Sequence, residues 1–374
     1  MTNDLQEKVF NALHKVERKL EFDNYAGYEV FDGLNTPLFN NAIFYNSKLL
    51  RLCVTQFFKK VPLNLRSFFF IAKTQDVKGL ALCLQSYLLN GNTYRAEEIY
   101  HLLLTKRLEN KHYWGYTWPY QLVAHYAKKD DPNVIATLFV LDSFLDYYEI
   151  SPSDDLKEVI NKTAEDLYAH FYLKDKGYFS YFLNTDFGVY NAIALSAYVL
   201  ARTDLILKGN NYVDSCYNAI NYVIKKQRSD GAWYYGDLKN HNFIDHFHTI
   251  YNLQALRFFG EILKYPLAQE SYIKGNEYYI NNLFRSDRLP KLYHNKDYPL
   301  DIHCFASAII YLTQTGQKPE YLEKILNYVI DEMQLPSGDF IFRVCSFYTN
   351  RNIYMRWCNA WMFYALSYYL KAFK

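Results

Sequence analysis

Strongly apolar segments alternate with amphipathic ones along much of the chain. The apolar segments are AIALSAYVLA (192–201), TIYNLQAL (249–256), FASAIIYL (305–312) and AWMFYALSYYL (360–370). Apolar residues on every side of a helix indicate burial on every side. The amphipathic segments SCYNAINYVIKKQ (215–227) and YLEKILNYVIDEM (321–333) have helical spacing and one polar face. The pattern therefore predicts hairpins that join an outer helix in contact with water to a buried inner helix.

Two series of positions repeat with a common period, which is long enough for one helix hairpin. Turns that combine Gly or Asp with aromatic residues recur at nearly equal spacing, around Gly177, Gly231, Asp287 and Gly338. Starts of the apolar segments follow them at equal spacing, at Asn191, His246, Asp301 and Arg356. Stacked hairpins form either an open solenoid or a closed ring, and the fully apolar inner helices favour closure. We therefore predict an all-α fold, an (α/α) toroid of about six helix hairpins.

The N-terminal part, residues 1–110, shows the period less clearly. It includes YEVFDGLNTPLF (28–39) and FFKKVPLNLRSFFFIAK (57–73), which do not match the repeat. WGYTWPYQLVAHYA resembles another turn followed by an inner-helix start at Gln121, more than one period before Asn191. We expect one domain over residues 1–374, with fewer regular hairpins in the N-terminal part.

Composition narrows the class of protein. The chain has 374 residues, 50% of them hydrophobic, which is enough for a large core. The 41 basic and 39 acidic residues are interspersed, so no basic stripe suited to nucleic acid is expected. Six scattered cysteines predict buried thiols rather than disulfides or a zinc site. No signal peptide and no apolar run of about 20 residues is found, which predicts a cytoplasmic protein without an integral membrane segment.

Candidate chemistry lies at the starts of the inner helices, which hairpin stacking brings to one rim. Asp245, His246 and His248 share one start, and Asp301 and His303 share the next. Carboxylates beside imidazoles transfer protons, and these five residues are the catalytic candidates. The alternative is that both aspartates are helix caps and the histidines belong to the core. No HExxH spacing occurs, so no metal and no cofactor are expected.

The substrate-binding candidates are of two kinds. Aromatic side chains stack on sugar rings, although packing at the helix turns explains them equally well. Arginines bind carboxylate or phosphate in a fork, although structural ion pairing is the alternative. Together with polar rim residues, the candidates are Trp114, Tyr116, Trp118, Gln121, Asn191, Trp233, Tyr251, Asp339, Arg343, Arg356 and Trp357.

Two resemblances support this interpretation. QRSDGAW resembles the Q-x-x-x-G-x-W turn of terpene cyclases, with Gln227, Gly231 and Trp233 in the three fixed places. Gln334, Gly338 and Phe340 form a degenerate copy, while the acidic DxDD and DDxxD motifs of prenyl chemistry are absent. The resemblance therefore implies an α/α fold and not prenyl cyclisation.

The ordered set WGYTWPYQ, QRSDGAWYYGD, IDHFHT, YPLDIH and YMRWCNAWMFYAL resembles an uncharacterised family encoded in bacterial surface-polysaccharide gene clusters. That family is distantly similar to the C-terminal domain of glucuronyl epimerases, and more loosely to acylglucosamine epimerases and unsaturated uronyl hydrolases. The resemblance implies a toroid that acts on a glycan or sugar, and no catalytic residue is carried over from it.

Three hypotheses follow. In the first, an enzyme epimerises or eliminates an acidic sugar: His246, His248 or His303 moves a proton, Asp245 and Asp301 orient the imidazoles, and Arg343 or Arg356 holds the carboxylate. In the second, a glycoside hydrolase uses Asp245 with Asp301 or Asp339 as its carboxylate pair. In the third, the protein is a non-catalytic glycan-binding or assembly scaffold.

Overall fold

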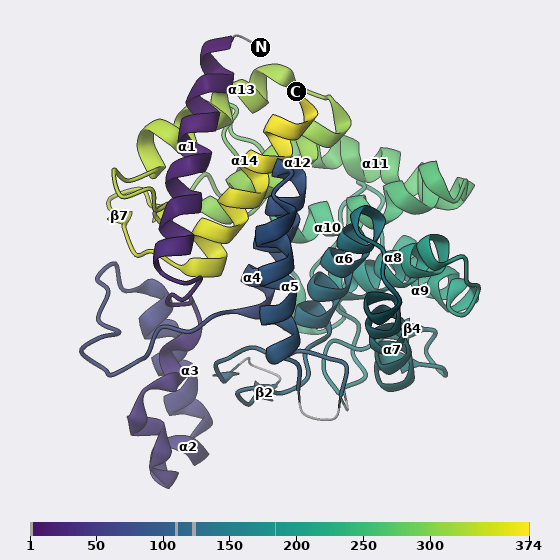
Figure 1. Cartoon of the computed structure of the whole chain (residues 1–374), viewed down its shortest axis with the longest axis horizontal. Helices are drawn as coiled ribbons and strands as arrows, with labels where there is room; N and C mark the ends of the chain where they lie inside the picture. The colour runs from purple at the N-terminus through teal and green to yellow at the C-terminus, as the bar shows by residue number, and fades with distance from the viewer. Residues whose placement is uncertain (1–2, 109–110, 122–124, 184, 374) are drawn as a thin grey trace. The chain divides into compact units, whose positions relative to one another are not determined.

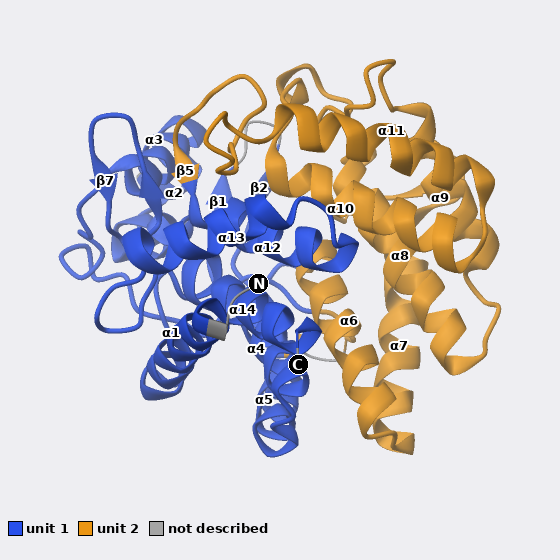
Figure 2. Cartoon of the chain, turned by 90° about the horizontal axis from the view of Figure 1, so that it is seen from above, with its two compact units in different colours: residues 1–106, 114–131, 301–374 blue, residues 107–113, 132–300 orange. Residues whose placement is uncertain are grey.

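The computed structural model describes residues 3–108, 111–121, 125–183 and 185–373, and it is built mainly of helices (Figure 1). The described part of the chain forms two compact units, coloured separately in Figure 2. Unit 1 comprises residues 1–106, 114–131 and 301–374, and unit 2 comprises residues 107–113 and 132–300. The expectation of one domain over residues 1–374 stays a prediction.

Unit 2 contains three helix hairpins in sequence order. The inner helices α6, α8 and α10 are buried along most of their length, and α8 packs against both α6 and α10. Each is followed by an outer helix that packs on it. The elements are α6 (Val134–Ile150), α7 (Asp154–Phe171), β3 (Tyr172–Leu173), β4 (Tyr178–Phe179), α8 (Tyr190–Leu207), α9 (Val213–Lys225), η3 (Lys239–His241), α10 (His246–Arg257), the π-helix η4 (Phe258–Ile262), α11 (Pro266–Asn282) and the first residue of β5 (Leu300–Asp301).

Unit 1 contains three more hairpins, and the last of them joins the two ends of the chain. Its hairpin elements are α1 (Asn3–Phe22), α4 (Val77–Asn90), α5 (Thr93–Thr105), α12 (Ile302–Thr315), α13 (Pro319–Tyr328), the π-helices η5 (Val329–Met333) and η6 (Met355–Ala360), and α14 (Trp361–Ala372). The apolar α14 packs against α12 and α4, and the N-terminal helix α1 lies along it as its outer partner. Helix α1 does this with the buried side chains Val9, Leu13, Val16 and Leu20, which recur at helical spacing.

The rest of unit 1 is irregular. Its remaining elements are η1 (Asp32–Asn35), η2 (Pro37–Asn40), α2 (Ala42–Asn46), α3 (Lys48–Lys60), the strand pair β1 (Tyr120–Gln121) and β2 (Tyr126–Ala127), and the strands β6 (Arg343–Val344) and β7 (Thr349–Asn350), which form a three-stranded sheet in the order β5-β6-β7. Four of the six cysteines are buried, whereas Cys53 is exposed and Cys345 half-buried, so the expectation of buried thiols is wrong for these two. Within the described residues, no helix combines the length and the apolar character needed to cross a membrane.

Two of the predicted repeat turns, those at Gly231 and Gly338, are bonded to the next outer helix. Gln227 donates from its amide to the carbonyl oxygens of Gly231 and of Ser271 on α11, and Trp233 Nε1 donates to Val223 O. In the degenerate copy, Gln334 donates to Gly338 O and to Ala12 O on α1. Helix α1 is therefore bonded to the Gly338 turn as α11 is bonded to the Gly231 turn. These bonds are the structural basis of the resemblance to the Q-x-x-x-G-x-W turn.

Replacing Gly231 with Ala is expected to lower the free energy of unfolding by about 2–5 kcal/mol, because a side chain meets both a left-handed backbone and a packed neighbour. Gly231 has φ +90° and an added Cβ would lie 2.4 Å from Lys274 O. Gly316→Ala is the matched control, since Gly316 has φ +64° with nothing within 4 Å of an added Cβ. Its expected loss is about 1–2 kcal/mol. Equal losses in denaturant titrations of the two variants would contradict the role of the close approach.

The inner helices begin close to the predicted positions. Helices α8, α10 and α12 begin at Tyr190, His246 and Ile302, each within one residue of the equally spaced series, and η6 contains Arg356. The series extends toward the N-terminus, because α6 and α4 begin after Asn133 and Asp76, whose side chains accept from the third amide that follows. Residues 77–105 therefore form a regular hairpin within the N-terminal part.

The prediction of an inner-helix start at Gln121 is wrong. Gln121 ends strand β1, where it pairs with Tyr126, and residues 122–124 lie outside the described part of the chain. The next inner helix begins further along the chain, at Val134. Asparagine is a favoured N-cap residue, and the residues after Asn133 are apolar. The helix therefore begins there rather than near Gln121, where the pattern is weaker.

Candidate functional site

A hollow in unit 2 lies beside the start of inner helix α10. Its cavity volume is about 10 Å³, close to the space that one water molecule needs, and it receives side chains from α8, from the turn after α9 and from α10. Its lining residues are Asn191, Trp233, Tyr234, Tyr235, Phe243, Asp245, His248, Thr249 and Asn252. Four of the candidates expected from the sequence, Asn191, Trp233, Asp245 and His248, thus share one small pocket.

Asp245 and His248 form a hydrogen-bonded pair in this hollow. Asp245 is the N-cap of α10: Oδ1 accepts from the backbone amide of His248 at 3.0 Å, and Oδ2 lies 2.7 Å from His248 Nδ1. The carboxylate is almost fully buried, whereas the imidazole is 24% exposed. Capping and imidazole orientation are therefore two functions of one carboxylate. Because Nδ1 is engaged by Asp245, Nε2 is the nitrogen that a ligand in the hollow can use.

Two buried amides in the hollow have unused hydrogen-bonding capacity. Asn191 on α8 and Asn252 on α10 are 3% and 2% exposed, and the Oδ1 atom of each has no hydrogen-bond partner among the described residues. A buried polar atom without a partner costs about 1–3 kcal/mol, so such atoms are rare unless a ligand or water satisfies them. Both residues line the hollow, so a ligand hydroxyl group that reached these buried oxygens would supply the missing hydrogen bonds.

The aromatic candidates of unit 2 differ in their surroundings. Trp233 is 2% exposed and donates a hydrogen bond to Val223 O, so most of its ring is buried in the turn and cannot stack on a ligand. Tyr235 stacks on Phe243 with ring centroids 5.0 Å apart and meets the edge of His248 at 4.7 Å. Tyr251 is buried and contacts His248 and Phe139. The rings that contact the imidazole are therefore Tyr235, Tyr251 and Phe247, of which the sequence does not single out Phe247, and Phe243 supports Tyr235 from behind.

His246 is in the core rather than in the hollow. Its side chain is fully buried, its Nε2 atom lies 2.9 Å from the hydroxyl oxygen of Tyr279, and Tyr279 and Phe284 pack against its ring. Burial lowers the pKa of His246 to about 3. The arrangement gives no support to proton transfer by His246 near neutral pH, and it matches the core-histidine alternative.

The buried neutral His246 makes folding stability depend on pH. In the unfolded chain His246 is protonated below about pH 6.5, whereas in the folded chain it stays neutral down to about pH 3. The free energy of unfolding is therefore expected to fall as pH drops through this interval. The slope that His246 contributes approaches ~1.4 kcal/mol per pH unit in the middle of the interval. His246→Gln should flatten the profile measured by denaturant titration between pH 4 and 6. An unchanged slope would contradict this assignment.

Asp301 and His303 are the equivalent candidates of unit 1, and both carboxylate oxygens of Asp301 already have partners within the protein. Asp301 is fully buried: Oδ1 accepts from His303 N at 2.9 Å and from Trp357 Nε1 at 2.9 Å, and Oδ2 is ion paired with Arg343 Nε. His303 is buried, with its ring against Trp357 and Trp361. Asp301 thus serves as a cap and as the anion for Arg343, which leaves it little capacity for proton transfer.

Arg356 is the centre of a buried charge cluster in unit 1. Its Nη2 donates to Glu29 Oε2 at 2.9 Å, its backbone amide donates to Glu29 Oε1 at 2.8 Å, and its Nε lies 3.2 Å from Asp76 Oδ1. The guanidinium also lies over the rings of Tyr116, Trp118 and Trp357. Arg343 and Arg356, the two arginines expected to hold a substrate carboxylate, are therefore each ion paired within the protein.

Burial changes the acidity of the groups around Arg356. It raises the pKa of Glu29 to about 8, although Arg356 opposes the shift, and burial likewise raises the pKa of Asp76. The pKa of the Lys78 ammonium is lowered well below its usual value, first by burial and then by Arg356. Perturbed buried groups are typical of functional sites and also of structural ion networks.

The remaining candidates of unit 1 have structural partners. Trp114 Nε1 donates to Leu103 O, Trp118 is buried and stacks on Tyr116, and Gln121 accepts from Arg51 Nε. Asp339 accepts from Ser337 Oγ and Asn359 Nδ2. Among the residues that the structure describes, no group of three or more His, Cys, Asp or Glu side chains has the arrangement of a metal site.

The comparisons with known proteins concern the fold. No protein-family model matches the sequence, and no curated protein sequence matches it significantly. The chain is similar to the structure of cellobiose 2-epimerase from Bacillus thermoamylovorans (12% identity, 98% of this chain and 99% of that one, TM-score 0.67). It is also similar to an unsaturated glucuronyl hydrolase specific for heparin (16%, 99% and 96%, TM-score 0.63) and to D-mannose isomerase (11%, 80% and 86%, TM-score 0.59). These similarities confirm the predicted all-α, α/α-toroid fold.

Proposed function

We propose that the protein is a carbohydrate-active enzyme that moves a proton at a sugar carbon, in the manner of an epimerase or isomerase. The observation that carries this proposal is the Asp245–His248 pair beside the unpaired amide oxygens of Asn191 and Asn252. A base and two hydroxyl acceptors in one small hollow suit a polyhydroxylated ligand. The structures with the same fold include a cellobiose 2-epimerase and a D-mannose isomerase, which adds support.

In this proposal His248 is the base. Asp245 accepts from Nδ1–H, so Nε2 carries the lone pair, and the carboxylate stabilises the imidazolium that forms when Nε2 takes a proton. Removal of a proton from the carbon beside the carbonyl of an open-chain sugar leaves an enediolate. Return of the proton from His248 to the neighbouring carbon, while a proton passes between the two oxygens of the enediolate, isomerises the sugar. Inversion requires instead that a solvent water molecule protonates the opposite face of the carbon, and His248 then loses its proton to solvent. Asn191 and Asn252 hold hydroxyl groups and so orient the reacting carbon.

Hydrolysis by a carboxylate pair has weaker support, although an unsaturated glucuronyl hydrolase shares the fold. Its proposed partners for Asp245 were Asp301 and Asp339, and both accept two or more hydrogen bonds or ion pairs within unit 1. A carboxylate so engaged is a poor nucleophile and a poor acid. An acidic substrate has less support than a neutral sugar, because Arg343 and Arg356 have protein carboxylates as partners.

Hydrogen exchange tests the proposal. The protein is incubated in deuterium oxide with cellobiose, D-mannose or D-glucuronic acid in turn, and incorporation at carbon is followed by NMR. We expect deuterium at one carbon of at least one of these sugars, with parallel loss of the starting stereochemistry or carbonyl position. Tight binding of a sugar without exchange would favour the scaffold hypothesis, and release of a monosaccharide from cellobiose without exchange would favour hydrolysis. A cytoplasmic location stays part of the proposal.

A further inference from the structure

Residues 33–75 of unit 1 form a basic and aromatic segment that contributes no side chain to the hollow of unit 2. Between Asp32 and Asp76, residues 33–75 contain six lysines and arginines and no acidic residue. The whole chain has a net charge of only +2, so the rest of it is net acidic. Helices α2 and α3, which belong to this segment, reach away from α1, α4 and α14 (Figure 1). Charge and shape thus set residues 33–75 apart from the helix hairpins.

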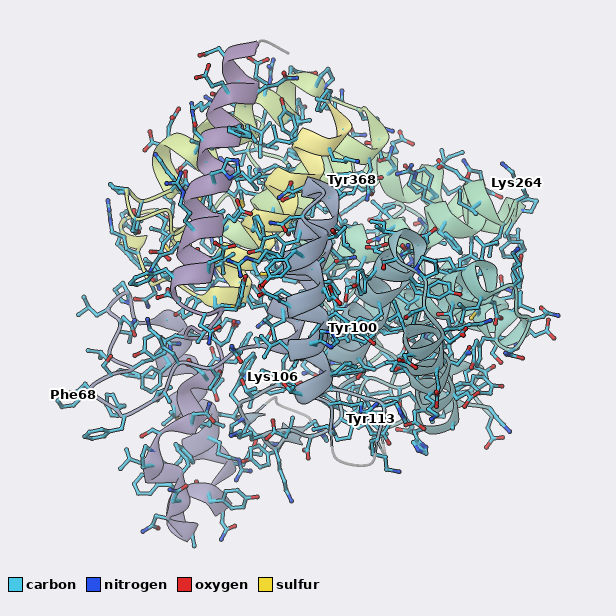
Figure 3. The ribbon with its side chains drawn as sticks, viewed as in Figure 1. Phe68, Tyr100, Lys106, Tyr113, Lys264 and Tyr368 are labelled. Atoms are coloured by element: carbon cyan, nitrogen blue, oxygen red, sulfur yellow. The ribbon has the colours of Figure 1, made fainter. Side chains whose placement is uncertain are left out.

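Large apolar side chains in this segment face water. Leu49, Leu63, Phe68 and Phe70 are 70%, 68%, 77% and 81% exposed, and Phe68 lies at the outer edge of unit 1 in Figure 3. Exposed lysines flank and interrupt this set in the sequence, at Lys48, Lys60 and Lys73. Single exposed apolar residues are ordinary, but several within one short basic segment indicate a surface that meets an apolar partner.

The loop that carries these side chains, residues 61–72, is held firmly at its base. Arg66 is fully buried, with its Nε 2.7 Å from Asp32 Oδ1 and its Nη2 donating to Glu29 O. The ring of Phe69 packs on Phe57 and Phe58. Phe70 has φ +54°, a left-handed conformation that is rare for an aromatic residue. The backbone is thus held in a strained conformation that displays Phe70 instead of folding it inward.

We infer that residues 33–75 form a peripheral binding surface for a membrane with anionic lipids. Lysines attract the anionic headgroups, and the rings of Phe68 and Phe70 enter the boundary between headgroups and acyl chains. A lipid surface fits better than a nucleic acid, because exposed Leu63 and Leu49 have no complement on a phosphate backbone. It also requires no spanning helix. This inference is independent of the sugar chemistry proposed for unit 2.

Vesicle flotation tests the inference with the full-length protein. We expect the wild type to float with vesicles of phosphatidylcholine and phosphatidylglycerol, to stay behind with phosphatidylcholine alone, and to bind less in high salt. The variant Phe68→Ser/Phe70→Ser and the variant Lys48→Glu/Lys60→Glu/Lys73→Glu should each bind about tenfold or more weakly. Ile262→Ser/Ile273→Ser is the control, since both side chains are 56% exposed and belong to unit 2 rather than unit 1. It should bind as the wild type does.

Three results would overturn the inference. The first is the absence of preference for anionic vesicles. The second is equal loss in the control and the Phe68→Ser/Phe70→Ser variant. The third is binding that depends on the lysines alone and is matched by DNA or heparin, which would indicate a general polyanion surface without insertion. Because every substituted side chain is exposed, all variants should keep the wild-type circular dichroism spectrum and unfolding midpoint.

Discussion

Replacing His248 with Gln is expected to lower kcat by roughly 10²–10⁴-fold, the usual contribution of a positioned base. The assay uses whichever sugar exchanges hydrogen with the wild type. Glutamine keeps a polar side chain beside Asp245 but has no basic nitrogen at the position of Nε2. KM should change far less than kcat, because the imidazole acts on the reacting carbon rather than on the hydroxyl groups.

The same substitution at an exposed histidine is the control. His101 on α5 is 64% exposed, and His101→Gln should leave both kcat and the unfolding midpoint unchanged. His248→Gln should also unfold within about 1 kcal/mol of the wild type, because the imidazole is partly exposed. If His248→Gln retains wild-type exchange, His248 is not the base and the proposed chemistry of the hollow is wrong.

Replacing Arg356 with Met is expected to lower the free energy of unfolding by about 3–5 kcal/mol, the usual cost of breaking a buried ion pair from one side. Glu29 and Asp76 would then be buried near one another without the guanidinium that faces both of them. The loss should grow as pH rises, because high pH favours the ionised form of Glu29, which burial already disfavours. Denaturant titrations at pH 6 and pH 9 measure both effects.

A double variant separates charge from packing. Arg356→Met/Glu29→Gln also removes one of the two carboxylates left without the guanidinium. It should recover part of the lost free energy of unfolding, most clearly at pH 9. Arg202, whose guanidinium is ion paired with Asp142, Asp146 and Glu149 nearer the surface of unit 2, gives the comparison. Arg202→Met should cost less, since its carboxylate partners are partly exposed. No rescue by Glu29→Gln would contradict the electrostatic account.

The repeat could be predicted from the sequence because it depends on local features. Apolar inner helices, amphipathic outer helices and the turns at Gly231 and Gly338 each follow from residues close together in the chain. The equal spacing of the apolar segments therefore located the starts of α8, α10 and α12 within one residue. The inner helix does not begin at Gln121 because irregular residues lie before α6, and Asn133 followed by an apolar run is the stronger start signal. Asp76 carries the same signal before α4.

Long-range pairings could not be predicted in this way. Nothing local to Glu29 shows that it accepts from Arg356, 327 residues away. Likewise, the amphipathic pattern of α1 indicates an outer helix but not that α14 is its partner. The distinction between His246 and His248 is also tertiary: they lie two residues apart, and only the packing of Tyr279 and Phe284 places His246 in the core. The sequence likewise does not show which carboxylates form ion pairs or hydrogen bonds within the protein, because their partners are brought close only by folding.

We propose that a sugar binds and reacts in the hollow beside α10. A crystal structure of the protein with the exchanging sugar bound tests it most directly. We predict sugar hydroxyl groups within hydrogen-bonding distance of the amide oxygens of Asn191 and Asn252, with the exchanging carbon next to His248 Nε2. A sugar bound elsewhere, with both amide oxygens still without partners, would contradict the claim.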